Sequence, residues 1–548
     1  MYSARCARKQ PATVLCLLVL IGFASAGFAA DEPVPSDTEL EKAGAVFGEI
    51  RVDNKNVFDQ KDPKDNKALF RLADKLHIKT RQSVIRHQLL FRSGDRYSRH
   101  AVEESARILR ADRYFYDASI VPVRYHDGKV DVLVTTRDVW TLDPGFNYNR
   151  SGGTNSTGFS LEELNLAGTG SMVAFGHSNS VDRSQSSVSF ANTHAFGTWT
   201  MVNLGYAQLS DGLQRLAIIN SPFYSLEARH AGGLTAQTDE HTDYLYDRGQ
   251  VIDKFQDHGV FAQAYGGWSA GLRNGWVRRW SAGVNYEERR FAPVASWLGP
   301  TLLPQDRRFL YPWIRFDLLE DEYIKLENRD QIGRTEDFYL GTNVTLRLGW
   351  SDTALGSSRS ALQFLAAAGR GAMLSESQTL IATSVFSGRV EDGTLHNSVL
   401  DSAIRYYLQQ SNNLLFFTSA HAVNGWRLDL ENQVLLGGDN GLRGYPLRYQ
   451  DGTGRALVSV EERWFSNWFP FRLFRVGAAA FADVGRTWGT PPLAAPSQGL
   501  LEDVGLGLRF GNARSGFGNV VHVDVAFPLR VFPGVDKVQF IVQTRASF

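Results

Sequence analysis

The sequence predicts a transmembrane β-barrel of about 16 antiparallel strands, preceded by a small α+β domain. Two observations indicate the barrel. Segments of alternating polar and apolar residues follow one another after about residue 140, and the 548-residue chain is rich in glycine (51) and in aromatic residues (12%). In addition, no apolar stretch outside an N-terminal leader approaches the roughly 18 residues of a spanning helix. Any membrane crossing must therefore be made by strands.

Residues 1–30 are predicted to be a secretory signal peptide. A basic start precedes the apolar segment 14–23, and small residues follow it as cleavage positions. The apolar segment is shorter than the roughly 20 residues that a helical span requires. Both cysteines of the chain lie in this leader, so we expect neither disulfides nor thiolate metal sites in the mature chain.

Residues 31–45 are acidic and contain prolines, so we expect a flexible leader there. Residues 46–140 mix strand-like and helix-like spacing of apolar residues, which is typical of a small α+β domain. The expected order is β-α-α-β-β, with a hairpin turn at Asp127-Gly128 between the last two strands. The spacing predicts strands over 47–52, 119–125 and 129–139, helices over 67–76 and 98–109, and a further apolar-spaced piece over 84–91.

Residues 141–548 are predicted to form the barrel. Spread over sixteen strands, they give about 25 residues for each strand and its loop. The last segment, 537–548, places apolar residues on one face and mostly polar residues on the other. A soluble sandwich would show the same alternation. The number of strands, the leader and aromatic residues at strand ends, such as Trp464 and Phe471, favour a barrel in a membrane.

A glycine-rich stretch, residues 437–445, interrupts the strands with the sequence G-G-D-N-G-L-R-G-Y. Its glycines predict a tight re-entrant loop, and Arg443 is the charged residue near the tip. In the strands that follow, the alternation turns Glu461 and Asp483 away from the apolar face. We therefore expect an arginine–carboxylate contact that holds this loop inside the barrel.

These features resemble the BamA/TamA/TpsB superfamily of outer-membrane barrels, whose members carry periplasmic POTRA domains. The β-α-α-β-β order of residues 46–140 is that of a POTRA domain, and the resemblance covers nearly all of the mature chain. The family's loop motif (V/L)-R-G-(F/Y) matches Leu442, Arg443, Gly444 and Tyr445, its strand motif (F/G)-x-D-x-G matches Phe481, Asp483 and Gly485, its turn N-L-x-G-T-G matches residues 165–170, and its terminal aromatic residue matches Phe548.

The resemblance implies that Arg443 pairs with Asp483 in the lumen, with Glu461 as a second acceptor. It also implies that the last strand, ending at Phe548, is similar to the signal that the assembly machinery recognises. A lateral gate is implied at the seam between the first strand, about residues 145–150, and the last. The chain has room for a single POTRA-like domain, fewer than the named branches of the family carry, which leaves the client open.

The implied function is to assist the insertion or translocation of polypeptides into or across the outer membrane of a Gram-negative bacterium. The POTRA-like domain would lie in the periplasm. Implied partners are outer-membrane lipid, unfolded or exported polypeptide clients, and periplasmic chaperones or accessory proteins that dock on the POTRA-like domain. The alternative is a passive porin or a surface-antigen barrel without a protein client.

Catalysis, metal binding and cofactors are not expected. Ser269 lies in a G-x-S-x-G pattern, but a nucleophile elbow needs a helix after the strand, and the next residues alternate like another strand. The 12 histidines are scattered, and we interpret His241 and its acidic neighbours at 239, 240 and 243 as a solvated loop. With 58 basic and 58 acidic side chains, the chain offers no electrostatic case for nucleic acid.

Overall fold

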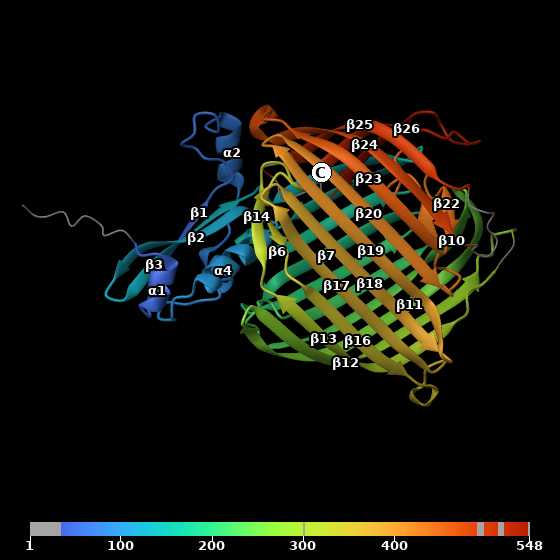
Figure 1. The fold of residues 1–548 in the computed structure, drawn as a ribbon, viewed down its shortest axis with the longest axis horizontal. Coiled ribbons are helices and arrows are strands. Elements are labelled where there is room, and N and C mark those ends of the chain that lie inside the picture. The colour runs from blue at the N-terminus through green and yellow to red at the C-terminus, as the bar shows by residue number, and fades with distance from the viewer. Residues whose placement is uncertain (1–33, 300–301, 490–497, 513, 515–519, 546–548) are drawn as a thin grey trace, which may run out of the picture.

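A closed antiparallel β-barrel makes up most of the molecule, and a small domain of helices and strands lies beyond one of its ends (Figure 1). The computed structural model describes residues 34–299, 302–489, 498–512, 514 and 520–545. The predicted signal peptide, residues 1–30, lies outside the described residues, as does Phe548.

The N-terminal domain, residues 34–140, packs helices on a three-stranded sheet of order β1-β3-β2. Strand β1 runs parallel to β3, and β3 pairs with β2 in antiparallel fashion. The turn between them is Asp127-Gly128, where both residues have positive φ, as the expected hairpin requires. Three helices lie between the first and second strands, where two were expected. The bounds are β1 (Val46–Lys55), α2 (Ala68–Leu76), α3 (Gln82–His87), α4 (Arg99–Ala111), β2 (Phe115–His126) and β3 (Lys129–Asp138).

The described part of the expected flexible leader is ordered. Residues Asp37–Lys42 form helix α1, and Leu40 is fully buried in the core of the domain. The side chain of Asp37 accepts a hydrogen bond of 2.6 Å from the hydroxyl of Tyr97. The acidic composition of this segment concealed the helix because it has a single apolar residue to bury.

The barrel closes with 20 strands among the described residues, so the expected number of about 16 is wrong. The strands are β4 (Leu142–Ser151), β5 (Thr154–Glu163), β6 (Ser171–Asn179), β7 (Ser184–Ala195), β8 (Thr200–Leu209), β9 (Gly212–Ser221), β10 (His230–Asp247), β11 (Gln250–Arg273), β12 (Trp276–Pro293), β13 (Arg307–Glu320), β16 (Asn343–Ser351), β17 (Ala361–Ser375), β18 (Gln378–Glu391), β19 (Thr394–Ser411), β20 (Leu414–Trp426), β23 (Gly454–Phe465), β24 (Phe474–Trp488), β25 (Leu501–Asn512), β26 (Val520–Pro528) and β27 (Gln539–Arg545).

Short hairpins explain the difference in strand number. For example, only Asn274 and Gly275 connect β11 to β12, and both have the positive φ of a two-residue hairpin turn. Several connections of this length leave less chain per strand than the assumed average of about 25 residues. The remaining short elements are β14 (Tyr323–Glu327), β15 (Thr335–Tyr339), β21 (Val434–Leu436), β22 (Gln450–Gly452) and the 3-10 helices η1 (Leu166–Gly168), η2 (Thr353–Leu355) and η3 (Pro470–Arg472).

The two faces of the barrel wall differ in polarity. On β25, Leu506 and Leu508 are exposed on the outside, whereas Asp503 and Arg509 are buried on the inside. Large apolar side chains are exposed in the same way on strands around the barrel, among them Phe146, Phe159, Phe175, Leu204, Leu234, Val284, Ile314, Leu346 and Phe540. An apolar outer face over a polar interior is the pattern of strands that span a membrane.

No helix among the described residues is long and apolar enough to cross a membrane.

Candidate functional site

The site is built around the lumenal loop, residues 427–453, which connects β20 to β23 and folds into the barrel. Its two ends pair with each other as the short strands β21 and β22. The chain between them turns back tightly: the N–H of Leu442 donates to the carbonyl of Gly437 at 3.0 Å, and the N–H of Gly438 donates to the carbonyl of Pro446 at 2.9 Å. The predicted re-entrant stretch is thus a compact tip.

Two glycines of the tip are required by geometry. Gly441 has a φ of 126°, which residues with a side chain rarely adopt. Gly444 lies against the barrel wall, and a Cβ atom at that position would stand 2.6 Å from the Cβ of Asp503. The first glycine allows the turn, and the second allows the tip to reach the wall.

Arg443 binds two carboxylates in the lumen. Its Nε and Nη2 donate to the two oxygens of Asp483 at 2.7 and 2.8 Å, and its Nη1 donates to Oε1 of Glu461 at 2.7 Å. The residue is only 2% exposed. Its guanidinium lies 3.4 Å from the ring centroid of Phe481, a cation–π contact. The structure therefore brings together the arginine and both acidic residues expected from the sequence.

The wall around this contact forms a network of charges. The second oxygen of Glu461 accepts a hydrogen bond of 2.8 Å from Nε of Arg463. Arg463 also stacks on Phe417, with 3.7 Å between the guanidinium and the ring centroid. Further along, Arg509 forms a buried ion pair with Asp524. Such charges are stable away from water only when each has partners, so the network fixes the loop in one position.

Sequence reasoning missed Asp503. Its Oδ2 accepts a hydrogen bond of 2.9 Å from the N–H of Gly444, and it stands directly opposite Asp483 in the pairing of β24 with β25. The alternation of apolar residues at 504, 506 and 508 would have placed it on the inner face. That signal was available, but no motif drew attention to it.

The rest of the loop motif packs the tip against the wall. Leu442 and Tyr445 are fully buried with Leu436 and Leu501. The hydroxyl of Tyr445 donates to the carbonyl of Glu502 at 3.1 Å. In the strand motif, a Cβ atom at Gly485 would stand 3.1 Å from the side chain of Leu436 and 3.3 Å from that of Leu457.

A second segment fills the opposite mouth of the barrel. This inner hairpin, residues 321–342, connects β13 to β16 and contains the paired strands β14 and β15. At its tip, Ile332 packs against inward-facing Tyr407 and Phe417 of the wall. No local pattern in the sequence indicates this hairpin, because Tyr407 and Phe417 are 75 or more positions away from Ile332 in the chain.

The inner hairpin also contacts the N-terminal domain. Arg110 of α4 donates two hydrogen bonds of 2.7 Å to the carboxylate of Asp337. His100 of α4 lies 3.1 Å from Asp321 at the start of the hairpin. Hydrogen bonding to Asp321 and Glu104 raises the pKa of His100 to about 10, and His100 lowers the pKa of Asp321.

The turn at residues 165–170, which lies between β5 and β6 of the barrel, contacts the N-terminal domain. The amide of Asn165 donates to the hydroxyl of Thr80 at 2.7 Å, and its oxygen accepts from the N–H of Gly170 at 2.6 Å. Beside it, the N–H of Arg81 donates to the carbonyl of Gly168 at 3.0 Å. The N-L-x-G-T-G turn thus has a structural role as a docking point for the domain.

The seam, where β27 meets β4, is the weakest junction of the described barrel. A single residue pair, Val542 and Arg150, is in register there, whereas seven pairs join β27 to β26 on its other side. The lumenal loop contacts β4 at this seam and β25, the second strand before β27. Ser151 of β4 donates to the carbonyl of Gly438 at 2.5 Å, and Asp503 of β25 accepts from Gly444.

Two further sequence features have a plain structural setting. Ser269 is fully buried within β11, and its hydroxyl donates to the carbonyl of Arg278 at 3.1 Å. A turn and another strand follow it. The interpretation of His241 and its neighbours as a solvated loop is wrong, because they lie in the strand β10.

Comparisons with known proteins give likeness at the level of shape. No family model and no curated protein matches the chain. BamA from Haemophilus ducreyi lacking POTRA domains 1–3 has a TM-score of 0.39 and 11% identity, over 91% of this chain and 84% of that chain. CdiB from Acinetobacter baumannii has a TM-score of 0.45 and 10% identity, over 92% and 73%. CdiB from Escherichia coli has a TM-score of 0.45 and 12% identity, over 92% and 77%.

Proposed function

We propose that this protein is an outer-membrane member of the BamA/TamA/TpsB superfamily and that it assists the insertion or translocation of polypeptides into or across that membrane. One observation carries the proposal: Arg443 of a re-entrant loop is held inside the lumen by Asp483 and Glu461, in the motif positions of that superfamily.

The outer face of the barrel supports a location in the outer membrane of a Gram-negative bacterium. The exposed apolar side chains on its strands would contact lipid, which is then the first partner of the protein. The N-terminal domain lies at the end of the barrel that also carries the inner hairpin (Figure 1). We place this end in the periplasm and regard the domain as POTRA-like.

The blocked lumen favours a gated transporter over an open pore. The lumenal loop and the inner hairpin each occupy part of the interior and are each held by buried ion pairs or packed side chains. A client would pass through the lumen only after one of these segments moves. Alternatively, it would leave the lumen sideways, through an opening in the barrel wall. The seam offers the sideways route, since few backbone hydrogen bonds must break between β27 and β4.

The N-terminal domain offers a docking edge. Strand β2 lies at the edge of the three-stranded sheet, and Val121 and Val123 are exposed along it. An extended polypeptide adds to such an edge by backbone hydrogen bonds, with side chains in alternate pockets. We assign unfolded or exported clients, and periplasmic chaperones or accessory proteins, to this edge. The mechanism needs no catalytic turnover and no cofactor.

Depletion of the protein, followed by quantitative proteomics of the outer membrane and the secreted fraction, tests this function. We expect selective loss of other barrels or of one exported protein, restored by the wild-type gene and restored poorly by Arg443→Ala. An unchanged proteome together with a high single-channel conductance would instead establish a passive porin. An unchanged proteome with a closed channel would leave a surface-antigen barrel.

A further inference from the structure

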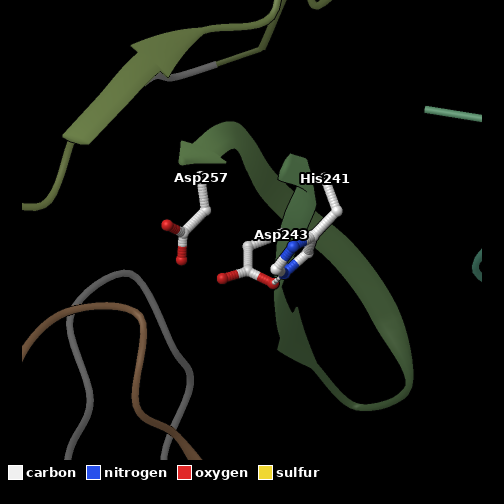
Figure 2. Close-up of side chains that lie close together, drawn as sticks. All are labelled: His241, Asp243 and Asp257. Atoms are coloured by element: carbon white, nitrogen blue, oxygen red, sulfur yellow. Dashed lines mark hydrogen bonds and ion pairs between the residues drawn. The ribbon is translucent and has the colours of Figure 1, made fainter. Parts of the chain in front are cut away.

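Three side chains of β10 and β11 lie close together (Figure 2). They are His241 and Asp243 of β10 and Asp257 of β11. One potential ligand atom of each lies within 4.8 Å of the others. His241 and Asp257 are direct partners in the register of the two strands, so the backbone itself brings them together.

Asp257 is a buried carboxylate with an unused oxygen. Its side chain is 1% exposed. Its Oδ2 accepts a hydrogen bond of 2.6 Å from Nη1 of Arg289, while Oδ1 has no hydrogen-bond partner among the described residues. The carboxylate of Asp243 lies beside it in Figure 2. A buried acceptor of this kind requires a proton, a water or a cation.

His241 lies between two carboxylates. Its Nε2 forms a hydrogen bond of 3.0 Å with Oδ1 of Asp243. In a tetrahedral Zn²⁺ site with bonds of about 2.1 Å, two ligand atoms are about 3.4 Å apart, so these two atoms would separate by a few tenths of an ångström to bind the ion. On the other side of the ring, Nδ1 lies 3.5 Å from Oδ2 of Asp239. Histidines that bind metals commonly have a carboxylate at this second nitrogen, which fixes the ring and its tautomer.

We propose that His241, Asp243 and Asp257 bind a divalent transition-metal ion, with Zn²⁺ as the first candidate. One imidazole and two carboxylates suit Zn²⁺ or a neighbouring ion, whereas Ca²⁺ and Mg²⁺ prefer oxygen ligands alone. Arg289 holds one oxygen of Asp257 and leaves the other for the ion. Asp239 positions the imidazole and does not itself bind.

The ion would join β10 to β11 just before the strands contact the lumenal loop. Five residues beyond His241, Tyr246 accepts a hydrogen bond from Arg448 of that loop, and the guanidinium lies 4.4 Å from the tyrosine ring centroid. Bound metal would therefore stiffen the part of the wall against which the loop rests. This role is independent of the client of the protein.

Zn²⁺ binding to the purified full-length mature protein, without an affinity tag and in detergent, tests the site. We expect one Zn²⁺ per chain after dialysis, removal of this ion by EDTA, and a higher melting temperature when Zn²⁺ is restored. His241→Ala and Asp257→Asn are expected to weaken binding at least ~10-fold, and Asp239→Asn by roughly 10-fold. His258→Ala is the matched control, because His258 neighbours Asp257 in β11 but is 46% exposed.

The outcomes separate clearly. The site would be supported if His258→Ala binds Zn²⁺ and melts like the wild type, while His241→Ala loses Zn²⁺ binding. Equal affinity in wild type and His241→Ala would overturn it, as would an equal rise in melting temperature with Ca²⁺. If the wild type binds no Zn²⁺ and Asp257→Asn is more stable than wild type, the two carboxylates share a proton and the metal site is rejected. Heat-dependent mobility in gels verifies that each variant is folded.

Discussion

Arg463 donates a hydrogen bond of 3.0 Å from Nη1 to the backbone carbonyl of Arg329, at the tip of the inner hairpin. The same guanidinium donates from Nε to Glu461, which in turn accepts from Arg443 of the lumenal loop. The two segments that fill the lumen from opposite ends are therefore connected through one carboxylate. A movement of either segment changes the surroundings of the other.

Arg443→Ala is expected to release the lumenal loop while the barrel still assembles. The change leaves two buried carboxylates without their main partner, at a cost of about 3 kcal/mol or more unless a proton or water compensates. We expect lower heat resistance in gels and a higher conductance in planar bilayers. Arg530→Ala is the control, because Arg530 is half exposed and 3.7 Å from Glu502. Wild-type behaviour of both Arg443→Ala and Asp483→Ala would refute the role of this contact.

Gly444→Ala is expected to displace the tip without removing any charge. The new Cβ would stand 2.6 Å from the Cβ of Asp503, so the loop or β25 must shift. We expect conductance to rise as in Arg443→Ala and stability to fall by roughly 1–3 kcal/mol. Gly266→Ala has open space around the added atom and should change stability by less than about 0.5 kcal/mol. If Gly444→Ala and Gly266→Ala behave alike, the close approach of Gly444 to Asp503 does not determine the position of the loop.

A disulfide across the seam tests lateral opening. Residues paired across antiparallel strands have Cα atoms about 4.5–5.5 Å apart, which suits a disulfide, and Arg150 and Val542 are such a pair. Arg150→Cys with Val542→Cys should crosslink under oxidation and block complementation of the depleted strain, with recovery on reduction. Leu204→Cys with Ala217→Cys makes the matching crosslink within β8 and β9 and should have no effect. Full activity of the oxidised seam variant would exclude lateral opening.

Asp337→Ala is expected to loosen the inner hairpin from the N-terminal domain. Arg110 makes two charged hydrogen bonds to this carboxylate, and their loss should cost roughly 1.5–3 kcal/mol. Amide hydrogen exchange in residues 323–339 should become faster, and a double-mutant cycle with Arg110→Ala measures the coupling. Unchanged exchange in this segment would mean that packing of Ile332 alone holds the hairpin.

The junction at His100 should weaken at high pH. The pKa of His100 is raised to about 10 in the folded protein, above its ordinary value of 6.5. Its contribution to stability is therefore complete below pH 6.5 and is lost as the pH rises toward about 10. We expect His100→Gln to destabilise the domain by on the order of 1 kcal/mol at pH 6 and by little at pH 10. Limited proteolysis between the domain and β4 measures this, and a pH-independent difference would contradict it.

The lumenal contact was predictable from local patterns. Alternation along β23 and β24 placed Glu461 and Asp483 on the inner face, and the glycines marked the loop that carries Arg443. The number of strands was not predictable in this way, because it depends on turn lengths, and alternation does not mark where one strand ends and a two-residue turn begins. The strand at His241 was hidden because polar residues occupy both faces there, beyond the apolar band.

The inner hairpin could not be inferred from the sequence for a different reason. Its position depends on contacts between Ile332 and side chains from several distant strands, and no local periodicity records such contacts. The same is true of the docking role of Asn165, whose partner Thr80 lies in another domain. The sequence motif located the turn at residues 165–170, and the structure supplied the physical reason for its asparagine.

Strand β11 is 24 residues long. At about 3.3 Å per residue and a tilt of about 45°, it rises roughly 55 Å, about twice the height of the apolar band of such a barrel. In the proposed outer membrane, roughly half of it would stand outside the cell. The part of the protein outside the cell would thus include a rigid extension of the β-sheet in place of a flexible loop. Antibodies against that surface should recognise the native barrel and fail on denatured protein.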